Sequence, residues 1–294
     1  MTSYQVTHTT TYSYDEDVTD SLGIAHVTPR ALPWQQVAST EVVIEPEPGD
    51  LSTDVDYYGN TVTYFQVTTP HTTLEVEAVS QVDVVAPAYD ESGFGLAWEE
   101  ARPLVHPELP GAWRATDMVV ASPLVETPEE AQAYAASSLR PGRPLVEAAV
   151  DLMHRIHADF DYDKAATTVT STVEEIFDAR GGVCQDFAHL MLACLRGHGL
   201  AARYVSGYLA TTPPPGKPRL VGADASHAWV ALWVPGADDG QWVMLDPTND
   251  QWVDDRYVTV GWGRDYADVP PVKGVIFTEA KKSTLAVSVD VAPV

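Results

Sequence analysis

The chain has 294 residues, with 42 aspartates and glutamates against 17 lysines and arginines, a formal net charge of −25. A surface this rich in negative charge repels phosphate backbones, which argues against a nucleic-acid partner. A chain of this length predicts two domains and is long enough to bury a sizeable core.

Neither a membrane segment nor a secretory leader is predicted. Met1–Val6 has no basic region followed by an apolar one, and no apolar run reaches the roughly 18 residues that span a bilayer. Cys184 and Cys194 fall on one predicted helix, about 15 Å apart between Cα atoms, beyond the ~7 Å limit of a disulfide. Two free thiols fit a reducing compartment, so we expect a cytoplasmic protein without a membrane partner.

Residues 1–88 predict an antiparallel β domain with one solvated face. β-Branched and aromatic residues alternate with polar ones in four stretches, namely Tyr4–Tyr12, Ser39–Ile44, Val62–Val67 and Thr73–Val84. Tyr58–Asn60, with a glycine at its centre, supplies a turn between two of these strands.

Residues 89–126 form a long segment in which proline and glycine are frequent. Such a length is typical of an ordered wrap over both domains rather than of a free linker, because its large apolar side chains need burial. These are Phe94, Leu96, Trp98, Leu104 and Trp113.

Residues 127–262 predict an α+β core. Helices are expected from Thr127 as N-cap before Pro128, over Pro144–Phe160, over Thr172–Phe177, and over Cys184–His198 before Gly199. Strands are expected over Ala202–Ala210, Ser226–Val234 and Gln241–Asp246, joined by loops at Thr211–Gly216 and Gly236–Gly240. Residues 263–294 predict a C-terminal segment with a final strand over Thr284–Val291.

The stretch Arg180–His189 carries the most specific chemical signal. Two glycines lead into a helix that begins at Cys184, where unpaired N–H groups and the positive end of the helix dipole favour a thiolate. We therefore predict Cys184 as a nucleophile. Cys194 lies mid-helix among leucines and a methionine and is predicted to be an inert core thiol.

A thiol nucleophile needs an imidazole base and a group that orients it. His227 is near the start of one predicted strand, and Asp246 ends the next, directly before Pro247. A short turn between antiparallel strands brings these two ends together, so His227 and Asp246 are predicted to face each other.

Two polar residues lie closer to Cys184 in the sequence. His189 and Asp186 sit roughly 140° and 160° around the helix axis from Cys184, so both point away from the thiol. Three positions apart on one face, they are predicted to form a hydrogen-bonded pair that anchors the helix, and a direct catalytic role for the pair stays open.

These motifs resemble a known family. Arg180–Tyr208, His227–Trp229 and Leu245–Pro247 resemble the transglutaminase-like cysteine enzymes. Tyr12–Tyr14, Thr28–Arg30, Gln36, Glu45–Pro46 and Asp56–Asn60 are similar to the β domain that precedes this core in bacterial members, and Gly263–Pro270 resembles their tail. The resemblance implies a papain-like core, in which the nucleophile helix packs on an antiparallel sheet, and a triad of Cys184, His227 and Asp246.

The backbone N–H of Cys184 is the generic oxyanion donor at a helix start. The residues that complete the oxyanion hole or support the triad remain open, and the candidates are Gln185, Tyr208, Asp186, His189 and Trp229. The animal transglutaminases have a tryptophan shortly upstream of the nucleophile, and here the nearest is Trp113. This difference puts amine-acceptor activity in doubt.

The expected function is thiol-dependent acyl transfer or hydrolysis at peptide or protein amide bonds through a thioester, with protease or amidase chemistry as consistent as cross-linking. The alternative is a catalytically idle scaffold that binds proteins or peptides. No H-x-x-x-H or C-x-x-C spacing supports a metal, an exposed helix face explains His154 and His157, and no cofactor is expected. The substrate's identity and the oligomeric state are not legible in the sequence.

Overall fold

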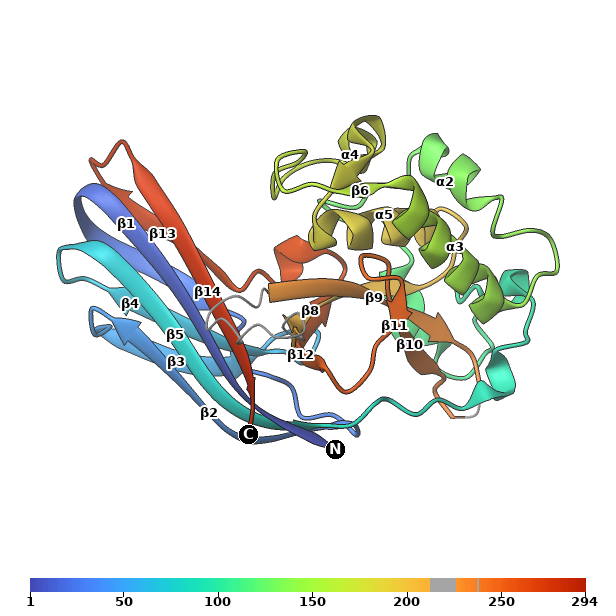
Figure 1. The fold of residues 1–294 in the computed structure, drawn as a ribbon, viewed down its shortest axis with the longest axis horizontal. Coiled ribbons are helices and arrows are strands. Elements are labelled where there is room, and N and C mark those ends of the chain that lie inside the picture. Colours follow the sequence, from blue (N-terminus) through green and yellow to red (C-terminus); the bar gives the residue numbers. More distant parts are fainter. Residues whose placement is uncertain (212–225, 237) are drawn as a thin grey trace, which may run out of the picture.

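The computed structural model describes residues 1–211, 226–236 and 238–294 and shows a β domain beside a mixed α+β core (Figure 1). Most of the predicted loop Thr211–Gly216, and residue 237 of the loop Gly236–Gly240, lie outside the described residues.

The β domain is built around one long, bent strand, β1 (Thr2–Ala25). Its first half pairs with β5 and β14 and its second half with β4 and β13, always antiparallel. The other strands are β2 (Gln35–Glu45), β3 (Asp50–Val55), β4 (Thr61–Val67), β5 (His71–Val84), β13 (Val272–Thr278) and β14 (Ser283–Pro293). The layers β2-β5-β1-β14 and β3-β4-β1-β13 enclose a core that includes Phe65, Leu74 and Val76.

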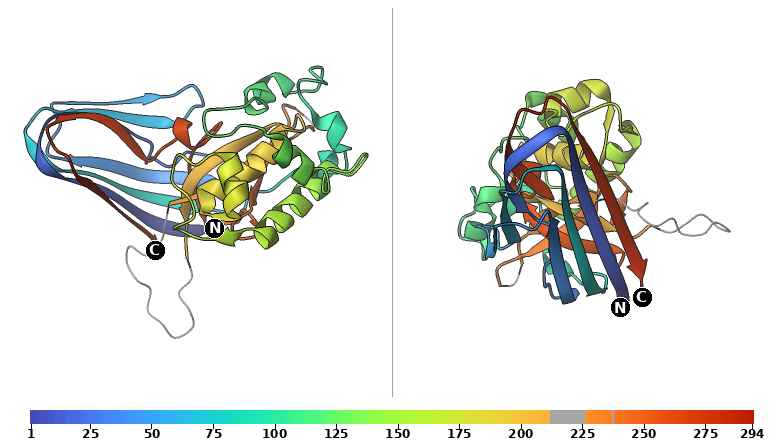
Figure 2. Two further views of the ribbon diagram at one scale, coloured as in Figure 1. Left: turned by 90° about the horizontal axis from the view of Figure 1, so that it is seen from above. Right: turned by 90° about the vertical axis from the view of Figure 1, so that its left-hand side faces the viewer.

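The predicted β domain is confirmed, and it is larger than the sequence indicated. The short strand β3 escaped prediction because it is exposed throughout and lacks a clear alternating pattern. The C-terminal segment contributes β13 and β14 rather than one final strand, and both join β1. Tyr4 lies opposite Pro293 in the sheet, so the two chain ends are neighbours (Figures 1 and 2).

The core places helices on an antiparallel sheet of order β11-β10-β9-β8-β12. Its strands are β8 (Ala202–Leu209), β9 (Ser226–Val234), β10 (Gln241–Asp246), β11 (Gln251–Trp252) and β12 (Tyr257–Gly263), and its helices are α2 (Glu129–Ala135), α3 (Leu145–Asp159), α4 (Val173–Ala179) and α5 (Cys184–Arg196). Helix α5 packs on β8 and β9 and is surrounded by the other three helices (Figure 1). Every residue of this helix except Cys184 is buried, including the polar side chains Gln185, Asp186, His189 and Arg196.

The predicted helices are confirmed, with one difference in capping. Thr172 caps α4: its Oγ1 accepts from the N–H of Glu175 at 3.2 Å, and the Glu175 carboxylate accepts from the N–H of Thr172 at 2.9 Å. The prediction of Thr127 as the cap of α2 is wrong. Pro128 takes that position because its backbone is extended, with ψ 157°, and the helix starts at Glu129.

The connecting segment packs mainly on the core and contacts the β domain at the turn that contains Tyr57 and Tyr58. It contains η1 (Glu91–Gly93), η2 (Trp98–Ala101), α1 (Ala112–Ala115) and η3 (Thr116–Met118). Trp98 is buried in the helical core, and the buried guanidinium of Arg196 in α5 donates to the Met118 carbonyl at 3.1 Å. The Tyr57 hydroxyl donates to Asp117 at 2.6 Å and ties the segment to the β domain.

Burial of two side chains in this segment was predicted wrongly. Leu104 and Trp113 are 55% and 71% exposed. The Trp113 ring instead stacks under the Arg114 guanidinium, 4.8 Å from its centroid, so a surface cation–π contact takes the place of burial.

The two domains share an apolar interface between the β1, β5 and β14 strands and the core strands β8 and β12. At its edge the Tyr208 hydroxyl lies 2.8 Å from Nδ1 of His8, whose Nε2 lies 3.0 Å from Thr10 Oγ1. Burial lowers the pKa of His8 to about 4, so the imidazole stays neutral at pH 7.

The stability that depends on neutral His8 is present above pH 6.5 and is lost as the pH falls towards 4, because the unfolded chain then binds a proton that the folded state excludes. Between pH 6.5 and 4 we expect the unfolding free energy of the His8→Gln variant to fall less steeply than that of the parent protein. The two slopes should differ by up to about 1.4 kcal/mol per pH unit. Urea denaturation across this range measures both slopes. Equal slopes would mean that His8 titrates normally in the folded protein.

Candidate active site

Two glycines determine how the chain enters α5. Gly181 and Gly182 form β7, which pairs in parallel with β6 (Asp161–Tyr162). A Cβ on Gly181 would lie 2.8 Å from the Asp161 carbonyl oxygen, and one on Gly182 would lie 2.5 Å from Asp186 Oδ2 and 2.7 Å from Asp186 Cβ. Only glycine allows both neighbours to approach this closely, so the pair aligns the first turn of α5 against β6.

Asp186 stabilises this turn. Its Oδ2 accepts hydrogen bonds from the Val183 N–H at 2.7 Å and from Thr167 Oγ1 at 2.6 Å. Burial raises the pKa of Asp186, and both hydrogen bonds oppose that rise. Thr167 was missed in the sequence, where it stands in a threonine-rich loop without a motif.

The predicted hydrogen bond between Asp186 and His189 is wrong. His189 Nε2 accepts from the Tyr266 N–H at 3.2 Å, and its Nδ1 has no partner among the described residues. Burial lowers the pKa of His189 to about 4, which keeps it neutral. The two side chains share a helix face but are drawn apart, Asp186 to the helix N-terminus and His189 to the C-terminal tail.

Cys184, His227 and Asp246 are brought together by three elements. Cys184 opens α5 and His227 stands second in β9, and both line a cavity of about 210 Å³. His227 Nε2 lies 2.7 Å from Asp246 Oδ2. The Leu245–Val230 pair is the last in register, so His227 and Asp246 meet diagonally across the two strands. Because the carboxylate holds Nε2, Nδ1 is the ring nitrogen left for the thiol.

Asp246 is completely buried and accepts four further hydrogen bonds. Its Oδ2 accepts from the Tyr257 hydroxyl at 2.6 Å and Asn249 Nδ2 at 2.7 Å, and its Oδ1 accepts from the N–H groups of Thr248 at 2.9 Å and Asn249 at 3.2 Å. Burial alone would raise the pKa of Asp246, but His227 and these donors lower it. Asp246 is therefore a carboxylate at neutral pH.

The imidazole responds to this negative charge. Burial lowers the pKa of His227, while hydrogen bonds with Asp246 and Cys184 outweigh burial and raise it to about 10. An imidazolium held between a carboxylate and a thiol is the arrangement that stabilises a thiolate.

Asn249 and Tyr257 were not identified from the sequence. Asn249 follows Asp246 in an Asp-Pro-Thr-Asn run, whose turn-forming composition was the available signal. Tyr257 begins β12, a strand that was not predicted, and nothing local marks it.

The remaining candidates have different surroundings. Gln185 lines the cavity, but its Nε2 donates to the Val169 carbonyl at 3.0 Å. Trp229 is buried behind the imidazole, 6.1 Å from the His227 ring and 5.2 Å from Tyr257 between centroids. Tyr208 is absent from the described cavity lining, and its hydroxyl is bound to His8 at the domain interface. Tyr208 thus joins the two domains through His8.

Cys194 is fully buried in the helical core, where burial raises the pKa of its thiol, and both cysteines are free, as predicted. His154 contacts Asp250, and His157 Nδ1 lies 3.0 Å from the Thr248 carbonyl oxygen. The two histidines of α3 therefore hold the turn that follows Asp246.

Within residues 1–211, 226–236 and 238–294, no cluster of three or more histidine, cysteine, aspartate or glutamate side chains is arranged to hold a metal ion. No helix in those same ranges has the length and apolar character needed to cross a bilayer.

Two family profiles match the chain. The bacterial transglutaminase-like N-terminal region matches residues 4–83, and the transglutaminase-like superfamily matches residues 132–247. An uncharacterized protein of Mycobacterium tuberculosis is 49% identical over 294 residues, which cover 99% of this chain and 92% of that protein. The chain belongs to the bacterial transglutaminase-like family.

Two further similarities concern fold and chemistry. A solved protein from Cytophaga hutchinsonii, named as a candidate cysteine protease, superposes with a TM-score of 0.74 at 17% identity, over 100% of this chain and 98% of its own. The whole two-domain fold is thus shared. A protein-glutamine gamma-glutamyltransferase of Pseudomonas aeruginosa is 37% identical over 95 residues, 31% of this chain and 14% of that protein.

Gly182→Ala should destabilise the protein by about 1–3 kcal/mol, because the new methyl group would overlap Asp186, which is held by the Val183 N–H. It should also slow the reaction of Cys184 with iodoacetamide. Gly95→Ala is the control, since nothing lies within 4 Å of a Cβ there. Thermal unfolding and thiol labelling measure both variants, and equal behaviour of the two would contradict the close approach.

Proposed function

We propose that this protein is a thiol-dependent enzyme that cleaves or transfers the acyl group of peptide or protein amides, with Cys184 as nucleophile, His227 as proton carrier and Asp246 as orienter. The observation that carries the proposal is His227, which connects a buried, hydrogen-bonded carboxylate to Cys184, a free thiol that lines the same cavity. Membership of the transglutaminase-like family supports thiol chemistry at amide bonds.

The mechanism begins with a thiolate at Cys184 beside the His227 imidazolium. The sulfur attacks the amide carbon, and the oxygen that becomes negative faces the first N–H groups of α5, which have no partner inside the helix. His227 then gives its proton to the departing amine as the C–N bond breaks, and a thioester remains on Cys184. Water or a second amine, deprotonated by His227, attacks the thioester and releases the thiolate.

Asp246 contributes by fixing the orientation and charge of the imidazole. Its hydrogen bond with Nε2 leaves Nδ1 directed to the thiol, and its charge stabilises the imidazolium. In this proposal the Cys184 N–H donates to the developing oxyanion, and Gln185, which lines the cavity, is a second candidate donor. Trp229 packs beside the imidazole ring.

Peptide hydrolysis and amine transfer share every step up to the thioester, so both belong to this proposal. The two free thiols support a reducing compartment, and we extend the proposal to a cytoplasmic enzyme. A scaffold that only binds other molecules would not need the charge arrangement around His227. That arrangement requires a buried carboxylate, and burying a carboxylate costs free energy of desolvation.

Cys184→Ala should abolish turnover of quenched fluorescent peptides and formation of a thioester detectable by mass spectrometry, with the fold unchanged. Cys194→Ala, the matched control, should cost about 1–2 kcal/mol of stability and leave turnover close to that of the parent, because Cys194 is a core residue. Turnover that survives in Cys184→Ala would remove the nucleophile assignment and favour the scaffold.

Asp246→Asn should shift the iodoacetamide reactivity of Cys184 to higher pH. The parent imidazolium persists to about pH 10, whereas loss of the carboxylate removes the interaction that raises the His227 pKa, so less thiolate is paired at pH 7. We expect a rate at pH 7 lower by about tenfold, below the ~10⁴ of a serine triad, because a thiolate depends less on the third residue.

The control for this change is Asp250→Asn, the same substitution in the same turn, where the carboxylate contacts His154 on the surface. Its labelling profile should match the parent. If Asp246→Asn labels like the parent, or unfolds, Asp246 holds the strand end and does not orient the imidazole.

A further inference from the structure

The β domain forms one wall of the cleft that contains Cys184. His8, Thr10 and Tyr12 of β1, with Leu285 and Val287 of β14, line the same cavity as Cys184 and His227. Strands β1 and β14 pair so that Thr10 lies opposite Val287 and Tyr12 opposite Leu285. Paired residues point to one face of a sheet, so these four side chains form a continuous surface.

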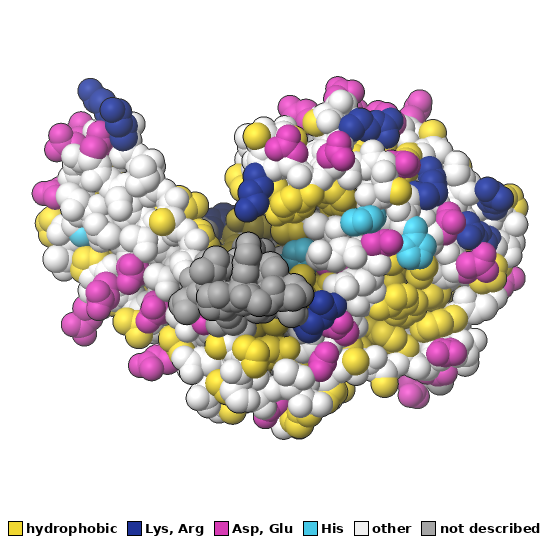
Figure 3. Space-filling model, in the orientation of Figure 1, with side chains coloured by type: hydrophobic (Ala, Val, Ile, Leu, Met, Phe, Trp, Pro, Cys, Tyr) yellow, Lys and Arg dark blue, Asp and Glu magenta, His cyan; other side chains and the backbone are white. Residues whose placement is uncertain are grey.

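The position of this surface follows from what covers the rest of the sheet face. Towards the chain ends, Tyr4 and Val6 of β1 pack on β8 and β12 of the core. Towards the bend in β1, Tyr14 packs against the second layer of the β domain, and the partly buried Tyr12 lies at the boundary, in contact with that layer and in the cavity wall. The stretch between faces the recess that separates the two domains, where hydrophobic side chains are visible (Figure 3).

The chemistry of the cleft differs from that of the molecule as a whole. The chain carries a net charge of −25, yet none of the described residues that line the cavity is an aspartate, glutamate, lysine or arginine. Leu285 and Val287 are 57% and 51% exposed beside the nucleophile. Exposed apolar side chains gain by contact with another apolar surface, whereas a charged side chain there would lose water without gaining a partner.

We propose that Tyr12, Leu285 and Val287 form a specificity subsite that receives an apolar, uncharged side chain of a peptide substrate, next to the amide that Cys184 attacks. This inference rests on the proposed function and adds the substrate class to it. It also assigns a task to the β domain, since the C-terminal strand β14 carries most of the subsite. Lysine, arginine, aspartate or glutamate at that position of a peptide is disfavoured.

The test uses the full-length protein and peptides that differ in one residue beside the scissile amide, on either side, with leucine, lysine or aspartate there. We expect kcat/KM for the leucine peptide to exceed the other two by about tenfold or more. Val287→Asp should lower kcat/KM for the leucine peptide about tenfold and improve the lysine peptide relative to it. Leu285→Ala, a milder change, should weaken the leucine preference without reversing it.

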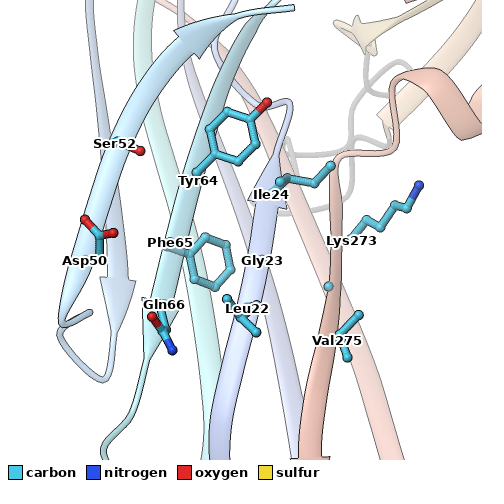
Figure 4. A pocket seen from close by; sticks show the side chains of 11 residues that line it. Leu22, Gly23, Ile24, Asp50, Ser52, Tyr64, Phe65, Gln66, Lys273 and Val275 are labelled. Carbon is cyan, nitrogen blue, oxygen red and sulfur yellow. The ribbon is translucent and has the colours of Figure 1, made fainter.

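The matched control is Val275→Asp. Val275 stands on β13 and is 62% exposed, but it lines a different groove on the other layer of the β domain, with Leu22, Tyr64 and Lys273 (Figure 4). Val275→Asp introduces the same charge into the same domain as Val287→Asp, but outside the cavity that contains Cys184. The peptide preference of Val275→Asp should therefore equal that of the parent protein.

A second readout separates this inference from the proposed function. Each peptide is also tested for protection of Cys184 against iodoacetamide, which requires binding but no turnover. Loss of the leucine preference in Val287→Asp, with Cys184 still reactive, supports the subsite. An unchanged preference in a folded Val287→Asp overturns it and leaves the enzyme assignment standing. Protection by the leucine peptide without Cys184-dependent turnover would keep the subsite and overturn the enzyme assignment.

Discussion

The candidate site depends on a carboxylate, that of Asp246, which has no access to water. Asp246 accepts five hydrogen bonds from four residues, and without them a buried charge would cost several kcal/mol. The donors come from β9, β12 and the turn after β10, so satisfying one side chain fixes the relative positions of three elements. The charge of Asp246 then raises the pKa of His227, which lines the same cavity as Cys184.

The other half of the site depends on close backbone approach. Gly181 and Gly182 let β6 and Asp186 reach the first turn of α5, and Asp186 holds the Val183 N–H. Cys184 is thereby held at the N-terminus of α5, where it lines the cavity. Cys184 and His227 thus belong to elements that are positioned in different ways. Close packing at two glycines positions the start of α5, whereas a hydrogen bond to Asp246 orients the His227 ring, and α5 packs against β9.

The chain crosses between the β domain and the core twice, and the two domains also pack against each other. The connecting segment leaves the β domain after β5, and the chain returns through β13 and β14 to the strand with which it began. His189 of α5 accepts from the Tyr266 N–H in the tail, so α5 also holds the segment that leads back to the β domain. This topology brings Leu285 and Val287 beside Cys184, about a hundred residues away in the sequence, and makes the cleft a product of both domains.

Much of the site could be predicted because its signals are local. The glycine pair before the helix that begins at Cys184, and the strand ends at His227 and Asp246, each depend on residues within a few positions, where helix and strand periodicity operate. The tertiary structure decided the partners. Tyr257 and Asn249 bind Asp246, His8 takes the Tyr208 hydroxyl, and Asp186 and His189 part despite sharing a helix face. The packing of the whole chain decides which donor reaches a buried acceptor. It also decides which strand completes a sheet that began more than 250 residues earlier in the sequence. Burial penalises every unpaired polar group, but no local sequence pattern records the partner of such a group.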